Sequence, residues 1–112
     1  MTVATFISAQ VNKAVVASTP TVIGAYVVPG ATTAIVTGGS ICNNSASAGT
    51  VDVSIWNGSI DVAFILKAQP IAGNSTVFFA GADSKWTLGT GQGIRFNCTQ
   101  IADAVMGVMQ VA

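Results

Sequence analysis

The fold of this chain is decided by residues 51–66, VDVSIWNGSIDVAFIL, in which an Asn-Gly pair separates two runs of alternating apolar residues. Such a pair is typical of a two-residue type I′ hairpin turn, because both central residues of that turn need a positive φ. The stretch therefore predicts a β-hairpin with a single register. Its expected core-facing pairs are Ile55 with Ile60, Val53 with Val62, and Val51 with Phe64.

The other face of the predicted hairpin carries polar side chains and one large aromatic ring. In the same register the side chains that face away from the core are those of Asp52, Ser54, Asp61 and Ala63. Trp56 lies beside them near the hairpin tip. There it is either exposed as a contact residue or covered by a local loop.

Strand signals continue along the rest of the chain. Turn residues recur about every eight to sixteen positions, which is the rhythm of a sandwich or barrel. The expected strands include residues 21–28, TVIGAYVV, and residues 31–42, ATTAIVTGGSIC, with a bulge or bend at Gly38 and Gly39. Residues 103–112, DAVMGVMQVA, alternate as a strand does rather than as a helix does. About seven to nine strands predict an all-β fold, an antiparallel β-sandwich with a jelly-roll or immunoglobulin-like outline.

The chain has the length of one domain. Its 112 residues are close to the commonest domain size, and we expect a single β-sandwich domain over residues 20–112. Residues 1–19 contain ATFIS and KAVVAS, which predict edge strands or an arm that orders on a partner. Because few charges are available to protect exposed strand edges, we expect oligomerisation or docking on a larger surface to cover them.

Charged residues are scarce and balanced. They make up 7% of the chain, with four Lys and Arg against four Asp and no Glu or His. Four scattered cations cannot form the basic surface that nucleic acid or an anionic membrane needs, so neither is an expected partner. The N-terminus lacks the cationic and apolar regions of a secretory signal, and no apolar run has the length of a transmembrane helix. We therefore expect partners to be held by shape, apolar contact and neutral hydrogen bonds.

The sequence offers little material for catalysis. Without His or Glu, the Ser-His-Asp, Cys-His and paired-Glu arrangements cannot be built, and we expect no enzyme activity, no cofactor and no metal site. The segment GTGQG at residues 89–93 does not match a phosphate-binding loop, and no helix pattern follows it. Cys42 and Cys98 lack the spacing of a zinc site. They are either two buried apolar residues or, in an oxidising medium, a disulfide.

Apolar side chains at places that look exposed are the candidate protein-contact residues. Phe78 and Phe79 are adjacent on a predicted strand, so they face opposite sides, and one of them needs cover from outside the main core. We expect at least two of Phe64, Phe78 and Phe79 to lie in the core. The predicted contact residues are Phe6, Ile7, Trp56 and one of Phe78 and Phe79.

Several segments, taken in order, resemble small all-β virion proteins of tailed bacteriophages. The resemblance rests on AYVVPGATTAIV, ICNNSASAGTVDVSIWNG, DVAFILKAQPIAGNSTVFFAG, LGTGQGIRFNCT and the closing ADAVMGVMQVA, and it covers roughly residues 20–112. It implies a structural component of a virion. In the preferred version this component is a decoration, or cement, protein on the outer surface of an icosahedral capsid.

The resemblance also implies partners and a location. The partners would be the major capsid protein or other virion proteins, and the chain itself would form a homo-oligomer, in one version a trimer at the junctions between capsid subunits. The protein would be made in the host cytoplasm and would reside in the virion. Two alternatives stay open at this point: an adaptor in the neck, tail or fibre base of the virion, and a carbohydrate-binding β-sandwich.

Overall fold

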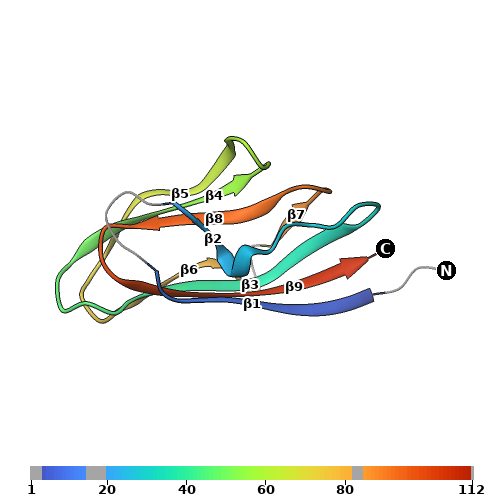
Figure 1. The fold of residues 1–112 in the computed structure, drawn as a ribbon. Coiled ribbons are helices and arrows are strands. Elements are labelled where there is room, and N and C mark those ends of the chain that lie inside the picture. The colour runs from blue at the N-terminus through green and yellow to red at the C-terminus, as the bar shows by residue number, and fades with distance from the viewer. Residues whose placement is uncertain (1–3, 15–19, 82–84, 112) are drawn as a thin grey trace.

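Two antiparallel β-sheets face each other across a layer of apolar side chains in the computed structural model, which describes residues 4–14, 20–81 and 85–111 (Figure 1). Sheet A contains, in order, β1 (Ala4–Ala14), β9 (Ala102–Val111), β3 (Thr33–Asn43) and β6 (Thr76–Ala80), and β7 (Trp86–Leu88) also pairs with β3. Sheet B contains, in order, β2 (Thr21–Val22), β8 (Gly93–Cys98), β4 (Gly49–Trp56) and β5 (Asp61–Ile71). The all-β sandwich predicted from the sequence is confirmed.

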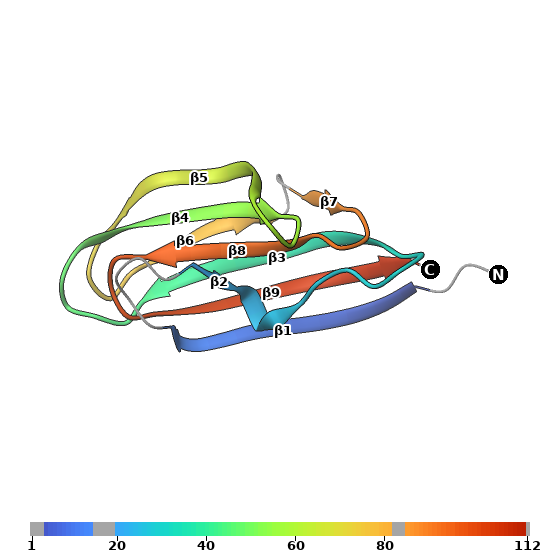
Figure 2. The ribbon, with the colours of Figure 1, turned by 45° about the horizontal axis from the view of Figure 1, so that its top comes forward.

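The strands pair in a nested order that identifies the type of sandwich. β1 pairs with β9, β2 with β8, β3 with β6, and β4 with β5, all of them antiparallel. A long antiparallel ribbon wrapped across two sheets has this order, which is that of a jelly roll rather than of an immunoglobulin domain. The first and last strands therefore lie side by side in sheet A (Figure 2).

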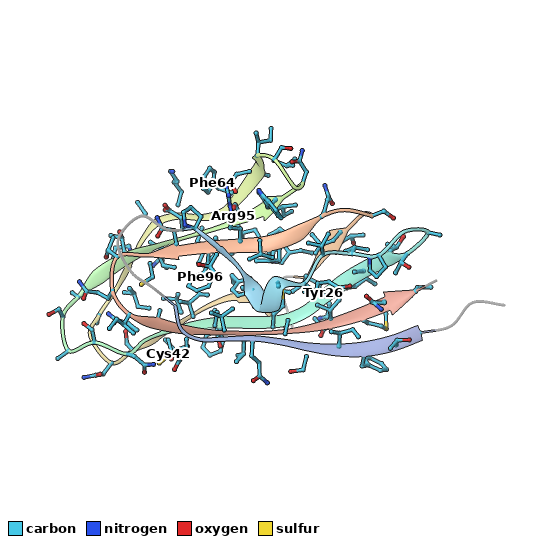
Figure 3. The ribbon with its side chains drawn as sticks, in the orientation of Figure 1. Tyr26, Cys42, Phe64, Arg95 and Phe96 are labelled. Atoms are coloured by element: carbon cyan, nitrogen blue, oxygen red, sulfur yellow. The ribbon has the colours of Figure 1, made fainter. Side chains whose placement is uncertain are left out.

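The core lies between the sheets and follows the alternation of the strands. In β9 the side chains of Ala104, Met106 and Val108 are buried, while the residues between them face outward, as predicted for this closing segment. Sheet B contributes Val53 from β4 and Phe96 from β8, both buried. Figure 3 shows Phe96 between the two sheets.

Strand β3 contains the predicted irregularity at its two glycines. Its register shifts between Val36 and Gly38 against β9, and again between Gly39 and Ser40 against β6. Gly39 faces the core, where a Cβ on it would lie 2.2 Å from Cζ of Phe79. Glycine is therefore required at this position for the buried Phe79 ring to pack against the backbone.

The hairpin of β4 and β5 forms, but its predicted turn and register are wrong. Asn57 does not adopt the positive φ that a type I′ turn requires. The connection is instead the longer loop of residues 57–60, in which Oδ1 of Asn57 accepts the backbone N–H groups of Ser59 and Ile60, each at 3.0 Å. Trp56 consequently pairs with Asp61 rather than with Ser59.

Three register shifts along the hairpin then add residues to β5 relative to β4. Val53 pairs with Leu66 instead of Val62 as a result. An edge strand such as β5 tolerates these bulges because, among the described strands, no second neighbour constrains its spacing. The predicted core residues Ile60, Val62 and Phe64 are 62%, 51% and 46% exposed.

The strand predicted over residues 21–28 is also wrong beyond its first residues. It is a strand only at β2, after which the 3-10 turn η1 (Ile23–Ala25) begins. Gly24 has a φ of 61° and lies against β1, where a Cβ on it would be 2.8 Å from the Cβ of Ala9. The turn carries the chain away from sheet B and toward the edge of sheet A, and this change of direction ends the strand.

Strand β1 forms one edge of sheet A, with β9 as its neighbour. It consists of residues 4–14, which belong to the segment predicted as edge strands or as an arm. Residues 1–3 and 15–19 of that segment lie outside the described residues.

Candidate protein-docking surface

The outward face of sheet A carries several large apolar side chains that this chain leaves uncovered. Its positions alternate with the buried ones along β1, β9, β3 and β6, because successive side chains of a strand point to opposite sides of the sheet. We call this surface the sheet A face; it comprises Phe6, Ser8, Gln10, Val105, Gly107, Met109, Ile35, Thr37, Gly38, Ser40, Cys42, Thr76 and Phe78.

A shallow hollow of about 460 Å³ lies on the sheet A face. Its floor is a row of small residues, because Ser8 pairs with Gly107 and Gly107 pairs with Gly38 across three neighbouring strands. A Cβ on Gly38 would meet no atom within 4 Å, so this position is open to the hollow. Phe78, 74% exposed, and Val105, 47% exposed, line one side.

A second group of apolar side chains lies on the other side of the row of small residues. Phe6, 77% exposed, pairs with Met109, which pairs in turn with Ile35. The row of small residues therefore separates two apolar ridges, with Phe6 on one and Phe78 on the other.

Charged groups border this surface without entering the hollow. Of the described residues that line the hollow, none is charged. At one end of β9, Asp103 accepts a hydrogen bond from the side chain of Asn44. At the rim of the hollow, the Lys85 ammonium donates to the Gly81 carbonyl at 3.3 Å. A partner on the sheet A face would therefore meet mostly apolar and neutral polar groups.

The predicted contact residues on β1 and β6 divide between the surface and the core. Phe6 and Phe78 share the sheet A face, whereas Ile7 packs against the core and Phe79 is buried in it. The two adjacent phenylalanines face opposite sides, as predicted. The expectation that at least two of Phe64, Phe78 and Phe79 lie in the core is wrong. Only Phe79 of these three is buried, because the bulges of β5 turn Phe64 outward and the alternation of β6 does the same for Phe78.

The outward face of sheet B holds a polar cluster around Asp61. Oδ1 of Asp61 accepts hydrogen bonds from the Ser54 hydroxyl at 2.6 Å and from Nε of Arg95 at 3.0 Å, and it lies 2.9 Å from Nη2 of Arg95. The hydrogen bond from Arg95 is the main cause that lowers the pKa of Asp61, while partial desolvation opposes it. Figure 3 shows Arg95 and Phe64 on this side of sheet B. The cluster thereby joins three neighbouring strands, β5, β4 and β8.

Trp56, the remaining predicted contact residue, belongs to this polar cluster. It is half-buried rather than fully exposed, and the Arg95 guanidinium lies 5.5 Å from its ring centroid. Its Nε1 atom is buried without a hydrogen-bond partner. The Lys67 ammonium lies 4.2 Å from the ring centroid of Phe64. Arg95, Asp61 and Lys67 therefore all have partners within this chain, and the cluster is an internal network rather than an open charged site.

Metal ligands and thiols offer no further site within the described residues. No group of three or more His, Cys, Asp or Glu side chains is placed there to hold a metal ion. Both thiols are free: Cys42 lies on the sheet A face, and Cys98 is buried on β8 of sheet B. The disulfide that the sequence left open is therefore not formed.

In the described part of the chain, no helix combines the length and the apolar character that crossing a bilayer requires.

Comparison with known protein families and with curated proteins finds no match to this chain. The sheet A face and the polar cluster of sheet B are therefore the features on which a function can be based.

The sequence pattern does not reveal the row of small residues. It indicates a bulge or bend at Gly38 and Gly39, and at Gly107 it indicates only the alternation of the last strand. The available signal was that both glycines, together with Ser8, fall at outward positions of their strands. Their alignment depends on the pairing of three strands distant in the sequence, which the composition of each strand does not specify.

Proposed function

We propose that this chain is a structural protein of a virion, and specifically a decoration protein bound as a homo-oligomer to the outside of an icosahedral capsid. The observation that carries the proposal is the sheet A face, where Phe6 and Phe78 stand exposed on either side of an uncharged hollow. Contiguous exposed apolar surface of this kind typically marks a contact with another protein. The net charge of zero suits dense packing, because copies with a large net charge would repel one another.

The fold supports the same assignment. Jelly rolls are frequent among viral capsid domains, and they also occur in lectins. A fold by itself does not assign a function. It agrees here with the resemblance of residues 20–112 to small all-β virion proteins, which favours the virion over the lectin.

The mechanism is mechanical. Bound across neighbouring copies of the major capsid protein, each decoration protein buries apolar and neutral polar surface. Separating the capsid subunits must then expose that area again, at a cost of about 25 cal/mol per Å² as an upper estimate. Repeated over a whole shell, these contributions resist internal pressure.

The test is to locate the protein on purified particles from its source with an antibody and electron microscopy. Label spread over the whole shell, with many copies per particle by quantitative mass spectrometry, is the expected result. Shells that lack the protein should then release their contents at a lower temperature. Label at one vertex or along the tail would replace the decoration role by that of an adaptor. Particles without label would overturn the virion assignment.

A further inference from the structure

We propose that the sheet A face pairs with the same face of a second copy of this chain, so that the Phe78 ring of each copy lies over Gly38 and Gly107 of the other. The inference rests on the proposed function in taking this face as a protein-docking surface, and it names the partner. A pair whose members are anchored on two neighbouring capsid subunits would join those subunits.

The shape of the face is self-complementary. The Phe78 ring projects beside a hollow of about 460 Å³ whose floor has no side chain at Gly38 or Gly107. The space over Gly38 is open, whereas the Thr37 hydroxyl lies beside Gly107 and donates to its carbonyl oxygen at 3.3 Å. In a two-fold pair the same patch serves both copies, so a projection must find a depression within its own patch. The sheet A face has both features next to each other. The two Phe78 rings would meet side by side, in the offset arrangement that aromatic pairs prefer.

The apolar character of the face provides the driving force. Phe6, Phe78 and Val105 are 77%, 74% and 47% exposed, and nothing in the described part of this chain covers them. Aromatic anchors that enter a desolvated pocket contribute most of the binding energy of protein interfaces. Phe78 is such an aromatic anchor, and the hollow of the second copy would be the pocket that desolvates it.

The charges allow two identical faces to approach. The described residues that line the hollow are uncharged, and the chain as a whole has a net charge of zero. The two charges at the border have opposite signs, Asp103 at one end and Lys85 at the rim. Identical copies therefore bring no block of like charge together, which would otherwise oppose self-association.

The face is also large enough. Strands β1, β9 and β3 have about ten residues each and β6 has five. With strands about 4.8 Å apart and residues rising about 3.4 Å each, their flat footprint is roughly 570 Å². Side-chain relief increases the accessible area of such a footprint. A stable protein interface buries about 800 Å² on each partner. With its side-chain relief included, this face is therefore comparable in area to one side of a stable interface.

The experiment measures the mass of the purified full chain by sedimentation equilibrium between about 1 and 100 µM. We expect a reversible species of twice the 11.2 kDa chain mass. Phe78→Ser removes the anchor, and Gly38→Val fills the floor of the hollow without an internal clash, since a Cβ there meets no atom within 4 Å. Each change occurs twice in the pair, so a tenfold loss at each site should raise the dissociation constant about a hundredfold.

Two variants serve as matched controls. Ile60→Ser removes an apolar side chain of similar exposure from the β4–β5 loop, and Gly30→Val adds the same side chain as Gly38→Val in open space away from the hollow. Both should leave the dissociation constant unchanged. Circular dichroism of every variant shows whether it is folded.

The outcomes separate this inference from the proposed function. A monomer at all concentrations, a trimer, or a pair that Phe78→Ser and Gly38→Val do not weaken would overturn the pairing of the sheet A faces. The antibody experiment on particles is independent of these results. A pair that forms as described, from a protein that is absent from particles, would leave the inference standing and overturn the virion role.

Discussion

Gly39 is a residue at which a single methyl group decides the packing. A Cβ on Gly39 would lie 2.2 Å from Cζ of Phe79, whose ring is buried in the core. We therefore expect Gly39→Ala to lower the free energy of unfolding by about 1–3 kcal/mol, because the ring must shift to make room. Urea unfolding monitored by tryptophan fluorescence measures the change.

The neighbouring glycine provides the control for this prediction. Gly38→Ala adds the same methyl group where no atom lies within 4 Å, so its effect should stay within about 0.5 kcal/mol. In the double variant Gly39→Ala with Phe79→Leu, the smaller side chain should recover part of the loss. Equal effects of the two alanine substitutions would contradict the assignment of Gly39 to the core side of β3.

Asp61 makes stability depend on pH. Its pKa is lowered in the folded protein, chiefly by the hydrogen bond from Arg95, so its contribution is fully present above the pKa of the unfolded chain, about 4. The contribution is lost as the pH falls through the lower pKa of the folded state. Asp61→Asn should cost about 1 kcal/mol at pH 7, and this cost should become smaller as the pH falls below about 4.

Paired urea titrations of the wild type and Asp61→Asn at several pH values measure this difference. The gap between the two curves should narrow as the pH falls below about 4. A gap of constant size from pH 7 to pH 2 would mean that Asp61 acts through packing and not through its charge.

At the scale of the elements, a bulge in β5 is held by one side chain of β4. Oδ1 of Asp52 accepts the backbone N–H of Ala68 at 2.6 Å, and Ala68 has a φ of 51°. Asp52→Ala should cost about 1 kcal/mol, because that N–H loses its acceptor. Asp52→Asn keeps an acceptor oxygen and should cost less.

Ala68→Gly should raise the free energy of unfolding by about 0.5 kcal/mol, because glycine adopts this backbone conformation without strain.

Chemical denaturation of these three variants tests the bulge. A decrease in stability for Ala68→Gly would contradict the backbone strain assigned to Ala68. An equal loss for Asp52→Ala and Asp52→Asn would contradict the role given to the hydrogen bond.

The same element shows how far the fold could be predicted. Alternation correctly located β4, β5 and β9 as strands, because it reports which side chains avoid water. It did not fix the register of β4 against β5. The Asn57 side chain closes a longer loop, and bulges in an edge strand leave Ile60, Val62 and Phe64 exposed without breaking the alternation of β4. Neither the loop length nor the bulges leave a mark in apolar periodicity.

The candidate site was predictable only in part for a related reason. Phe6 and Phe78 stood out as apolar residues in need of cover, and the structure brings both to the sheet A face. The same criterion, an apolar side chain at a place that looks exposed, also selects Ile7, Phe79 and Trp56. These three side chains lie wholly or partly inside the molecule. The direction of a side chain on an isolated strand depends on which partner strand it meets. The nested pairing of the jelly roll supplies that information across most of the chain length.

At the scale of the whole molecule, the two outward faces of the sandwich differ in character. Sheet B satisfies its charged groups internally through Asp61, Arg95 and Lys67. Sheet A leaves aromatic rings exposed around a floor of small residues. The charges therefore reinforce the strand pairing of one sheet, while the apolar surface of the other remains available for association.

The two thiols allow the difference between the outer face of sheet A and the core to be tested. Cys98 faces the core from sheet B and is 3% exposed, whereas Cys42 lies half-buried on the sheet A face. Cys42 points outward from sheet A and Cys98 points into the core from sheet B, so sheet A lies between the two sulfur atoms and no disulfide can join them in the folded state. We expect two free thiols by intact mass after aerobic purification, and a melting temperature that a reducing agent does not change.

The reaction rates of the two thiols then compare the accessibility of Cys42 on the sheet A face with that of Cys98 in the core. In the folded protein a thiol reagent should modify Cys42 first and Cys98 only on unfolding, because the reagent cannot enter the core. Cys42→Ser should abolish the faster reaction and nothing else. If the sheet A faces pair, the faster rate should also fall as the protein concentration rises, and Phe78→Ser should remove that dependence. A mass lower by two hydrogen atoms, or equal rates for both thiols, would contradict the placement of Cys42 on the sheet A face and of Cys98 in the core.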